Sequence, residues 1–373
     1  MIDKLTIDQC CICMACSEIC PVDAIKYTNY INGVGYPQID YKKCIQCNRC
    51  EQVCPVNKEF LQLSINKPDT FVARSREKNT RIASTSGAVF FELAKWILKS
   101  RGYICGAVFD SKFQVQHQLT NDFEIVKNMR GSKYVQSDIG HVYREIEKLV
   151  SDNMILFCGC PCQVAGLKRY LGKSYNNLIL MDFVCHGIPS QKMFDEYREC
   201  LEKRYKSKIH KFQFRNKNKG WHNSSVYVEF ENGKIYTVPI TIDAYMRAFL
   251  SGTSIKECCF NCQFKRFKSG SDISVADFWG AEVLMPQLDD NTGLSAVFIH
   301  TEKGQNILKR LDIEKFVIDP EFVIDYNRNV IESTAPSVYR KQFLNLAEQY
   351  DSELPKKLTL NKLALIGKAE KSP

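Results

Sequence analysis

The feature that most constrains this chain is a pair of cysteine runs in its first sixty residues. Both runs have the spacing C-x2-C-x2-C-x3-C-P. The first consists of Cys10, Cys13, Cys16, Cys20 and Pro21, and the second of Cys44, Cys47, Cys50, Cys54 and Pro55. Three thiols at intervals of three let a short loop wrap around one metal cluster, so these runs predict metal binding by thiolates.

This spacing is the pattern of bacterial ferredoxins that hold two 4Fe–4S clusters. The fourth cysteine of each run starts a segment that leads away from its own loop, so it reaches the other cluster. Each proline fixes its own backbone angle and helps to end the loop. We expect cluster I to be held by Cys10, Cys13, Cys16 and Cys54, and cluster II by Cys20, Cys44, Cys47 and Cys50.

Residues 24–40, between the two runs, alternate apolar and polar residues around Asn32-Gly33, which predicts a small hairpin covering the clusters. Cys11 is an extra thiol beside the first loop, and we do not expect it to be a ligand. The alternatives are a zinc site and a disulfide knot. Zinc sites usually pair two C-x2-C units, so two runs of four cysteines that end in proline favour iron–sulfur clusters.

Composition indicates the cellular compartment in which these thiols function. The chain has 373 residues and 18 cysteines, with no stretch resembling a signal peptide and no apolar run long enough for a transmembrane segment. We therefore expect a cytoplasmic protein in which thiols are reduced. The net charge of +9 is interspersed with acids, for example Glu199 and Glu202 beside Lys203, so we do not expect nucleic-acid binding.

Beyond a polar linker at residues 64–69, helical and strand patterns alternate. Residues 84–102 read as a helix with Ser84 or Thr85 as N-cap and Gly102 as a stop. The further expected elements are strands at 103–109, 154–159 and 177–185 and helices at 139–151, 162–172 and 190–205. This alternation predicts an α/β core with a partly parallel sheet, and hairpin-like strands after about residue 209 make an α+β fold possible there.

Several cysteines follow the predicted strands, where ligand sites gather in such sheets. Cys160 and Cys162 follow one strand, Cys185 follows the next, and a third group contains Cys258, Cys259 and Cys262. Our hypothesis is a third 4Fe–4S cluster (cluster III) held by Cys162, Cys185, Cys259 and Cys262. The alternative is that these cysteines are buried as small apolar residues.

Seven short blocks, in order along the chain, resemble the coenzyme F420 hydrogenase/dehydrogenase β-subunit family. They are STSGAVF, GSKYVQS, PCQVAGLK, VCHGIPS, FRNKNKGW, CFNCQFK and DISVADFWG, between about residues 71 and 311. The resemblance implies an iron–sulfur flavoprotein with FAD in the α/β core beside an internal cluster. Cys160 stands where the family usually has threonine, which makes it a rival ligand, and the adjacent pair Cys258 and Cys259 leaves a similar choice.

The expected FAD-binding residues are Ser86, Gly87, Ser132, Lys133 and Tyr134. Ser86 and Gly87 are expected to open a helix whose N–H groups suit a pyrophosphate. For the second group, Ser132, Lys133 and Tyr134, the alternative is an ordinary turn. His186, beside Cys185, is the candidate catalytic proton donor, with a structural histidine as the alternative. Trp221 and Trp279 are expected to pack in the core or on a cofactor.

These expectations combine into three domains: a dicluster ferredoxin domain at 1–62, an FAD and iron–sulfur core at 68–330, and a helical C-terminal tail at 331–373. The expected function is an oxidoreductase that passes electrons from a ferredoxin or another redox protein through 4Fe–4S clusters to FAD and on to a small-molecule substrate. The alternatives are a non-catalytic electron-transfer subunit that serves a partner enzyme and, less favoured, an iron–sulfur redox sensor.

Overall fold

The computed structural model describes residues 2–31, 33–56 and 67–348. Its N-terminal part contains η1 (Ile2–Lys4), α1 (Ala15–Glu18), β1 (Ile25–Ile31), β2 (Val34–Ile39) and α2 (Arg49–Gln52). The antiparallel pairing of β1 with β2 confirms the predicted hairpin, whose turn residue Asn32 lies outside the described residues. The predicted boundary at residue 62 also lies outside them, as do residues 349–373 of the predicted tail.

The core is built on a mixed sheet of eight strands in the order β13-β3-β12-β11-β7-β6-β4-β5. Neighbouring strands are parallel from β4 through β6 and β7 to β11, and antiparallel elsewhere, so the predicted partly parallel sheet is confirmed. The strands are β3 (Asp69–Ser75), β4 (Tyr103–Phe109), β5 (Val115–Thr120), β6 (Ile155–Gly159), β7 (Leu178–Phe183), β11 (Ile273–Asp277), β12 (Ser295–Ile299) and β13 (Ile313–Val317).

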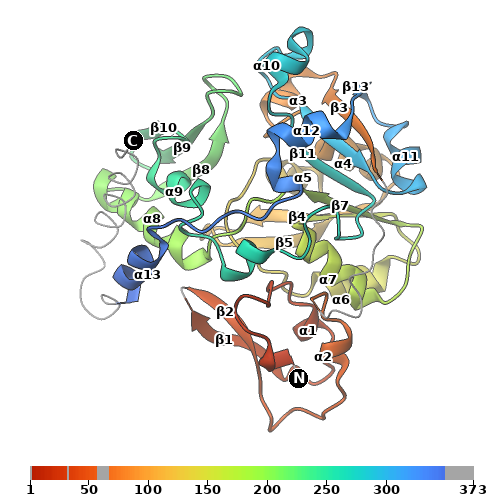
Figure 1. The fold of residues 1–373 in the computed structure, drawn as a ribbon, viewed down its shortest axis with the longest axis vertical. Helices are drawn as coiled ribbons and strands as arrows, with labels where there is room; N and C mark the ends of the chain where they lie inside the picture. Colours follow the sequence, from red (N-terminus) through yellow and green to blue (C-terminus); the bar gives the residue numbers. More distant parts are fainter. Residues whose placement is uncertain (1, 32, 57–66, 349–373) are drawn as a thin grey trace.

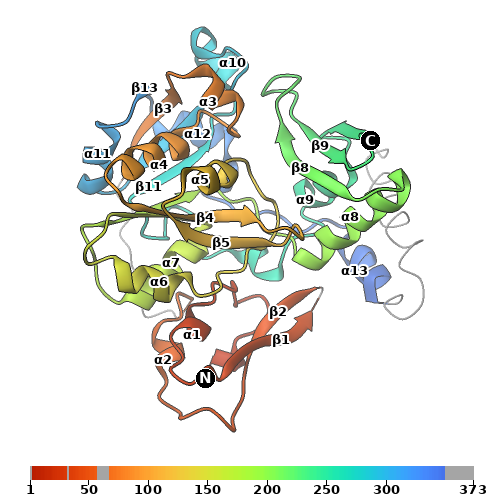
Figure 2. The ribbon, with the colours of Figure 1, turned by 180° about the vertical axis from the view of Figure 1, so that it is seen from behind.

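Helices cover both faces of this sheet (Figure 1). On one face lie α4 (Val89–Lys99), α5 (Phe123–Met129) and α11 (Glu302–Leu308), and on the other lie α6 (Val142–Leu149) and α7 (Pro161–Leu171). Successive side chains of β6 point to opposite faces of the sheet, so the strand contributes to the apolar core on each face. Ile155 and Phe157 face α6 and α7, whereas Leu156 faces α4. The N-terminal part lies below α6 and α7 in both views, so this face of the sheet is the one next to the cysteine runs (Figure 2).

A smaller antiparallel sheet packs beside the first and confirms the hairpin-like strands predicted after residue 209. It is formed by β8 (Ile209–Asn216), β9 (Ser225–Phe230) and β10 (Ile235–Pro239), and its apolar core includes α8 (Gln191–Tyr205) and α9 (Ala244–Leu250). Helix α8 begins as predicted, with the Ser190 hydroxyl accepting from the Met193 N–H at 3.3 Å. The remaining elements are α3 (Lys78–Ile82), η3 (Glu257–Asn261), α10 (Ala281–Leu284), η4 (Pro286–Leu288), α12 (Pro320–Tyr326), η5 (Arg328–Val330) and α13 (Arg340–Glu348).

One predicted helix start is wrong. Helix α4 begins at Val89, after Ala88 in the left-handed region with φ 69°, so neither Ser84 nor Thr85 is its N-cap. Gly87 lies before the helix: its carbonyl accepts from the Ser75 N–H at 2.8 Å, and its own N–H donates to Ser295 Oγ at 2.9 Å. A side chain there would lie 2.3 Å from the Ala73 carbonyl. The segment is therefore held between β3 and β12 instead of opening a helix.

Among the described residues, the helices are all too short or too polar to cross a membrane.

Candidate functional site

The two cysteine loops have the same backbone conformation. Ile12 and Met14 in the first loop have φ of 57° and 62°, and Gln46 and Asn48 at the same positions of the second have φ of 57° and 56°. Left-handed residues other than glycine are uncommon, and alternating them with right-handed ones turns successive N–H groups toward one point. Two such loops in one domain are suited to surround two similar anionic centres.

The structure brings together the two predicted sets of four thiols. The Cys16 thiol is close to Cys10, Cys13 and Cys54, and burial raises its pKa in the absence of metal. A separate hollow is lined by the other predicted set, Cys20, Cys44, Cys47 and Cys50. In that set, backbone N–H groups donate to sulfur, from Ala24 to Cys20 Sγ at 3.3 Å and from Gln46 to Cys44 Sγ at 3.4 Å. Such bonds stabilise thiolate ligands, so both sets fit 4Fe–4S clusters.

The first loop is packed directly against the core. The Tyr143 hydroxyl of α6 donates to the Cys13 carbonyl at 3.1 Å. A side chain on Gly166 of α7 would lie 2.9 Å from Cys13 Cβ, so only glycine lets this helix approach so closely. Arg144 of α6 donates to the Glu18 carbonyl at 2.7 Å and to Asp23 Oδ1 at 2.8 Å. The cluster I thiols therefore lie at the boundary with the core.

A cavity on the core side of this boundary gathers the thiols predicted to hold cluster III. Its volume is about 790 Å³ when its open mouth is included, and Cys162, Cys185, Cys259 and Cys262 all line it. Cys162 lies in the first turn of α7 just after β6, and Cys185 lies two residues after the end of β7. These are carboxyl ends of parallel strands, where the sequence placed them.

The rival ligands differ in position. Cys160 is the N-cap residue of α7 and is absent from the described lining of the cavity, whereas Cys162 lines it. The Cys160 thiol is nevertheless within hydrogen-bonding reach of Cys162 and Cys185, so the geometry leaves Cys160 as a rival ligand. Cys258 and Cys259 both line the cavity, and their thiols are within hydrogen-bonding reach of each other, so the geometry leaves that choice open.

Cys11 joins the two regions. Its buried thiol is within hydrogen-bonding reach of Cys13 in the first loop and of Cys162 in the cavity. The Lys256 ammonium donates to the Cys11 carbonyl at 3.0 Å and to Gln136 Oε1. We did not single out Lys256 from the sequence, where a lysine near cysteines gives no sign of burial.

Lys256 provides a test of whether a cluster fits the cavity. Its residue is 4% exposed, and in the described part of the chain its hydrogen-bond partners are two neutral oxygens, with no carboxylate paired to it. Burial alone lowers the pKa of a lysine, but the thiols of Cys258, Cys259 and Cys162 raise the pKa of Lys256 above its usual value. A buried cation needs a nearby negative charge, and a thiolate-bound cluster in this cavity would supply it.

An acidic group also lines the cavity. Asp182, at the end of β7, accepts hydrogen bonds from Ser269 at 2.5 Å and from Ser274, and burial raises the pKa of its carboxyl to about 6. Ser274 also bonds to His300 Nε2 at 2.8 Å. This buried polar network fixes the ends of β7 and β11 beside the cavity.

His186 also lines the cavity, but both of its ring nitrogens have partners in the protein. Nε2 is 3.2 Å from the Phe249 carbonyl, and Nδ1 is 3.2 Å from Asn329 Nδ2 and 3.3 Å from Thr334 Oγ1. Burial lowers its pKa, so the neutral ring is favoured. The structural alternative accounts for these contacts, and its role as a proton donor stays a prediction.

The predicted flavin residues lie together, but two of them are already used by the protein. The Ser132 N–H donates to Thr85 Oγ1 at 2.9 Å, which places the second predicted group beside Ser86. The Gly87 N–H is bonded to Ser295, and the Lys133 ammonium lies within hydrogen-bonding distance of four carbonyls at the end of α5, between 2.9 and 3.3 Å. These two do not fit the role of free phosphate donors.

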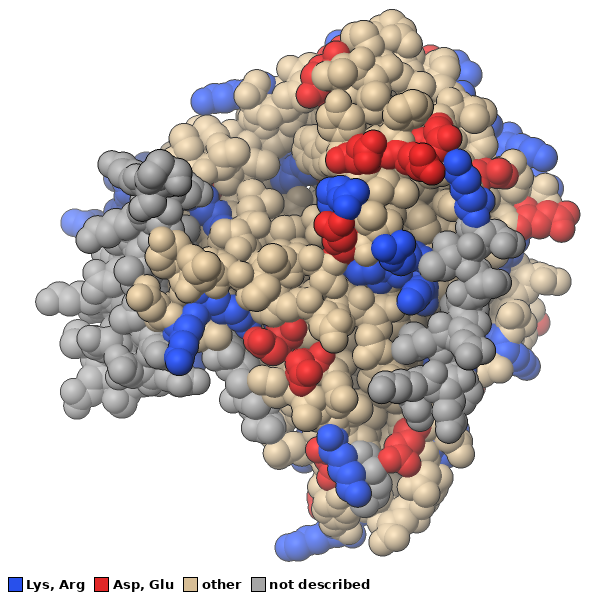
Figure 3. All heavy atoms as spheres, viewed as in Figure 1, with Lys and Arg blue, Asp and Glu red and all other residues tan. Residues whose placement is uncertain are grey.

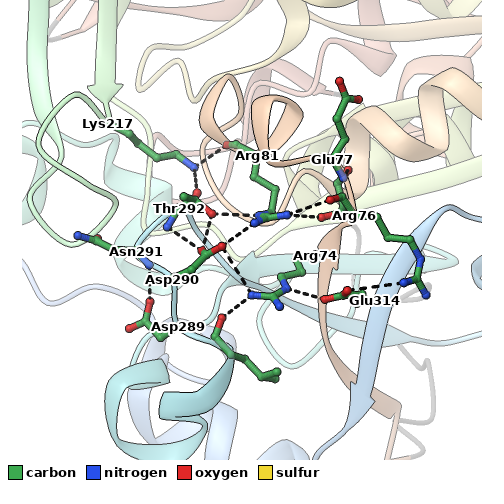
Figure 4. Close-up of polar contacts among 12 residues, drawn as sticks. Arg74, Arg76, Glu77, Arg81, Lys217, Asp289, Asp290, Asn291, Thr292 and Glu314 are labelled. Atoms are coloured by element: carbon green, nitrogen blue, oxygen red, sulfur yellow. Dashed lines mark hydrogen bonds and ion pairs between the residues drawn. The ribbon is translucent and has the colours of Figure 1, made fainter.

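A lysine from another block of the resemblance holds the Ser86 segment in place. Lys217 donates to the carbonyls of Ser86 at 3.3 Å and Arg81 at 2.8 Å and also to that of Thr292, and Figure 4 shows Arg81 reaching from the same cluster to Asp290. Burial lowers the pKa of Lys217 to about 7. This network orders the loops at the carboxyl end of β3.

An arginine that we did not single out is the better fit for an anionic cofactor there. Arg215 is paired with Asp277 at 2.5 Å and its side chain is 3% exposed. Within the described structure, its Nε and Nη2 atoms make no hydrogen bond of good geometry, although Tyr134 is within hydrogen-bonding reach of the guanidinium. The Trp279 ring lies 5.1 Å from the guanidinium. Trp279 in turn stacks on Trp221, with ring centres 5.2 Å apart. Unused buried N–H groups next to an aromatic ring are suited to an electron-rich planar ligand.

Comparison with known proteins identifies both parts of the chain. Residues 152–319 match the family model that describes the C terminus of the beta subunit of coenzyme F420 hydrogenase/dehydrogenase, and residues 9–58 match the model of the 4Fe–4S dicluster domain. The resemblance found in the sequence is therefore confirmed. The chain thus combines a segment similar to a 4Fe–4S dicluster domain with a segment similar to the C terminus of this subunit family.

A solved structure similar to the chain is that of a xenon derivative of the F420-reducing NiFe hydrogenase complex from Methanosarcina barkeri. It is 17% identical, the match covers 82% of this chain and 92% of that one, and the TM-score is 0.48. No curated protein matches the chain.

Proposed function

We propose that the chain is an iron–sulfur flavoprotein oxidoreductase. It takes single electrons from a ferredoxin or another redox protein, passes them through three 4Fe–4S clusters to FAD, and reduces a small-molecule substrate. Clusters I and II are held by the eight cysteines of the two runs, and cluster III by Cys162, Cys185, Cys262 and Cys259. Cys160 is the rival of Cys162, and Cys258 is the rival of Cys259.

The contact of Cys11 with both Cys13 and Cys162 carries this proposal. It connects a predicted ligand of cluster I with a predicted ligand of cluster III across the boundary between the dicluster domain and the core. A continuous path of packed groups between redox centres is what an electron-transfer chain requires. Two unrelated metal sites would give no reason for this close approach.

The core residues that would hold FAD are Ser132, Tyr134 and Arg215. The support is the family resemblance together with the unpaired nitrogens of Arg215 beside Tyr134. When bound, FAD would accept electrons one at a time and donate them as a pair. The chain would orient it against Trp279 and exclude water, because this tryptophan and its neighbour Trp221 form a stacked pair at the carboxyl end of β11.

Metal and flavin analysis tests the proposal. Protein purified without oxygen should contain about 12 irons and 12 sulfides per chain, with one FAD. Cys262→Ser should lower the iron content to about 8 and leave the dicluster signals intact, because Cys262 has no adjacent rival thiol. Cys200→Ser, a change in α8 at a cysteine outside the predicted ligands, is the matched control and should keep about 12 irons. Equal iron in the Cys262→Ser variant and the parent would refute cluster III at this place.

One observation favours the alternative of an electron-transfer subunit that serves a partner enzyme. The edge strand β13 and the helix after it expose large apolar side chains, with Phe316 40%, Val317 79% and Phe322 53% exposed. An exposed apolar edge of this kind suits a protein partner. About 8 to 12 irons without flavin, and no two-electron acceptor reduced by the isolated chain, would support this alternative.

A further inference from the structure

The two cysteine loops share one backbone conformation, but they face different surroundings. In the first set, Cys10, Cys13, Cys16 and Cys54 are each 7–8% exposed. In the second set, Cys47 is exposed and Cys20, Cys44 and Cys50 are half-buried. The core covers the first loop, so a protein that approaches the dicluster domain meets the second.

At equivalent positions, the side chains of the first loop are buried and those of the second loop are exposed. The residue after the first cysteine of the run is Cys11, 8% exposed, in one loop and Ile45, 61% exposed, in the other. The residue before the third cysteine is the buried Ala15 in one loop and the exposed Arg49 in the other. Tyr41, just before the second run, is 57% exposed. The second loop thus presents apolar side chains beside the exposed Cys47.

Cations surround these apolar side chains. Lys42, Lys43 and Arg49 are exposed, and in the described part of the chain none of them pairs with a carboxylate. Three acids lie nearby. Asp40 accepts from the backbone N–H of Lys42 at 3.0 Å, and Asp3 accepts from the Tyr41 hydroxyl at 2.6 Å. Asp23 interacts with Lys43 but is paired with Arg144 at 2.8 Å. Figure 3 shows Lys and Arg side chains projecting at the lower end of the molecule, with Asp and Glu side chains among them, where the dicluster domain lies in Figure 1.

We propose that this surface, made of Tyr41, Lys42, Lys43, Ile45 and Arg49 and called the entry face below, is the docking site of a soluble redox protein with an acidic surface. Its apolar centre and charged rim match the anatomy of a transient protein interface, and its unpaired cations favour a negatively charged partner. The proposal rests on the proposed function and specifies where its donor binds and of what charge.

The step at this face is a single electron transfer. The reduced carrier loses one electron, and the site held by Cys20, Cys44, Cys47 and Cys50 gains it. No bond forms or breaks, and no proton is needed. The entry face contributes by holding the carrier against Cys47, the most exposed thiol of the set. From there the electron would pass from the exposed thiol set of the second loop to the buried set of the first loop. It would then reach the cavity thiols through Cys11.

The test is the rate at which the holoprotein is reduced, followed by loss of cluster absorbance in a stopped-flow instrument. The donor is a reduced acidic two-cluster ferredoxin, and dithionite serves as a small reductant that needs no docking. The variant Lys43→Glu/Arg49→Glu reverses two charges of the entry face. The control Lys234→Glu/Lys309→Glu makes the same charge change at exposed sites elsewhere.

The charge-reversed variant should keep its iron, should be reduced by dithionite at the parent rate, and should be reduced by ferredoxin at least about tenfold more slowly at low salt. The control should behave like the parent. Ile45→Ser should slow ferredoxin without changing the salt dependence. Equal ferredoxin rates in parent and charge-reversed variant would overturn the proposal.

Two further outcomes have clear meanings. If the entry face instead binds a single-stranded oligonucleotide and the ferredoxin rate does not change on reversal, the face is a nucleic-acid site and the proposal fails. Because the readout is cluster reduction, it needs neither FAD nor a substrate. A chain without flavin that still shows the predicted rates would refute the flavoprotein function and leave the entry face supported.

Discussion

Replacing Lys256 by methionine should lower the reduction potential of cluster III. The ammonium is buried between the dicluster domain and the cavity, where it bonds to the Cys11 carbonyl at 3.0 Å. Reduction adds a negative charge to a thiolate-bound cluster, and a nearby cation stabilises that charge. Methionine has a similar length and no charge, so Lys256→Met removes this stabilisation while filling much of the same space.

The size of the effect follows from Coulomb's law. At an effective dielectric constant of about 20 and a separation of roughly 7 Å, one unit charge contributes about 2.4 kcal/mol. For a one-electron couple this corresponds to about 100 mV. Cys10 of cluster I feels the same cation more weakly than the cavity thiols, so the shift should be smaller at cluster I and smallest at cluster II.

A redox titration followed by electron paramagnetic resonance measures the potentials of the three clusters separately. Lys265→Met is a matched comparison, because Lys265 lines the same cavity but is half-buried, with its ammonium bonded to the Cys185 carbonyl at 2.7 Å. Solvent should screen that charge and give a smaller shift. An unchanged or higher potential of cluster III in a Lys256→Met protein with full iron content would refute the reasoning.

Two further predictions concern packing and protonation. Gly166→Ala should destabilise the holoprotein by about 1–3 kcal/mol in urea unfolding, because the new methyl group would lie 2.9 Å from Cys13 Cβ; unchanged stability would contradict the close approach of α7. Burial raises the pKa of Asp182 to about 6, so the folded state binds more protons than the unfolded state between about pH 4 and 6. Stability should therefore fall by roughly 3 kcal/mol as pH rises through this range, and Asp182→Asn should abolish that slope; an infrared band of a protonated carboxyl, lost near pH 6 in the parent alone, provides a second readout.

Much of the fold could be predicted because local patterns decide it. Strand β4 was predicted at its observed bounds, and β6 and β7 within two residues, since short apolar runs end at glycine or polar residues there. The start of α4 was wrong because Ser84 and Thr85 satisfy the usual N-cap pattern, whereas Gly87 pairs with Ser75 and Ser295. Pairing with β12, more than two hundred residues away, leaves no local signal.

Some residues of the candidate site could be predicted from local sequence patterns and others could not. The thiol sets could be proposed from spacing and from strand ends, because clusters need several thiolates at one place. Lys256, Arg144 and Gly166 act through contacts with residues more than one hundred positions away, so their burial and partners became visible only in the structure. Lys133 shows the converse: it was predicted to bind FAD, but its ammonium contacts the carbonyls that end α5, which no local pattern indicates.

The direction of electron flow can be argued from the residues between the cysteines. Both runs build the same loop, so the cysteines themselves do not distinguish an inner cluster from an outer one. The spacer residues do: Met14 Sδ accepts from the Ile139 N–H of the core, and Ile12 is buried against Val34 and Tyr36 of the hairpin. Gln46 and Asn48 at the same positions are exposed. Apolar spacers are stable only against protein, and polar spacers next to water. In the proposed electron-transfer chain, the spacers therefore favour the first loop as the one next to the core and the second loop as the one open to a partner.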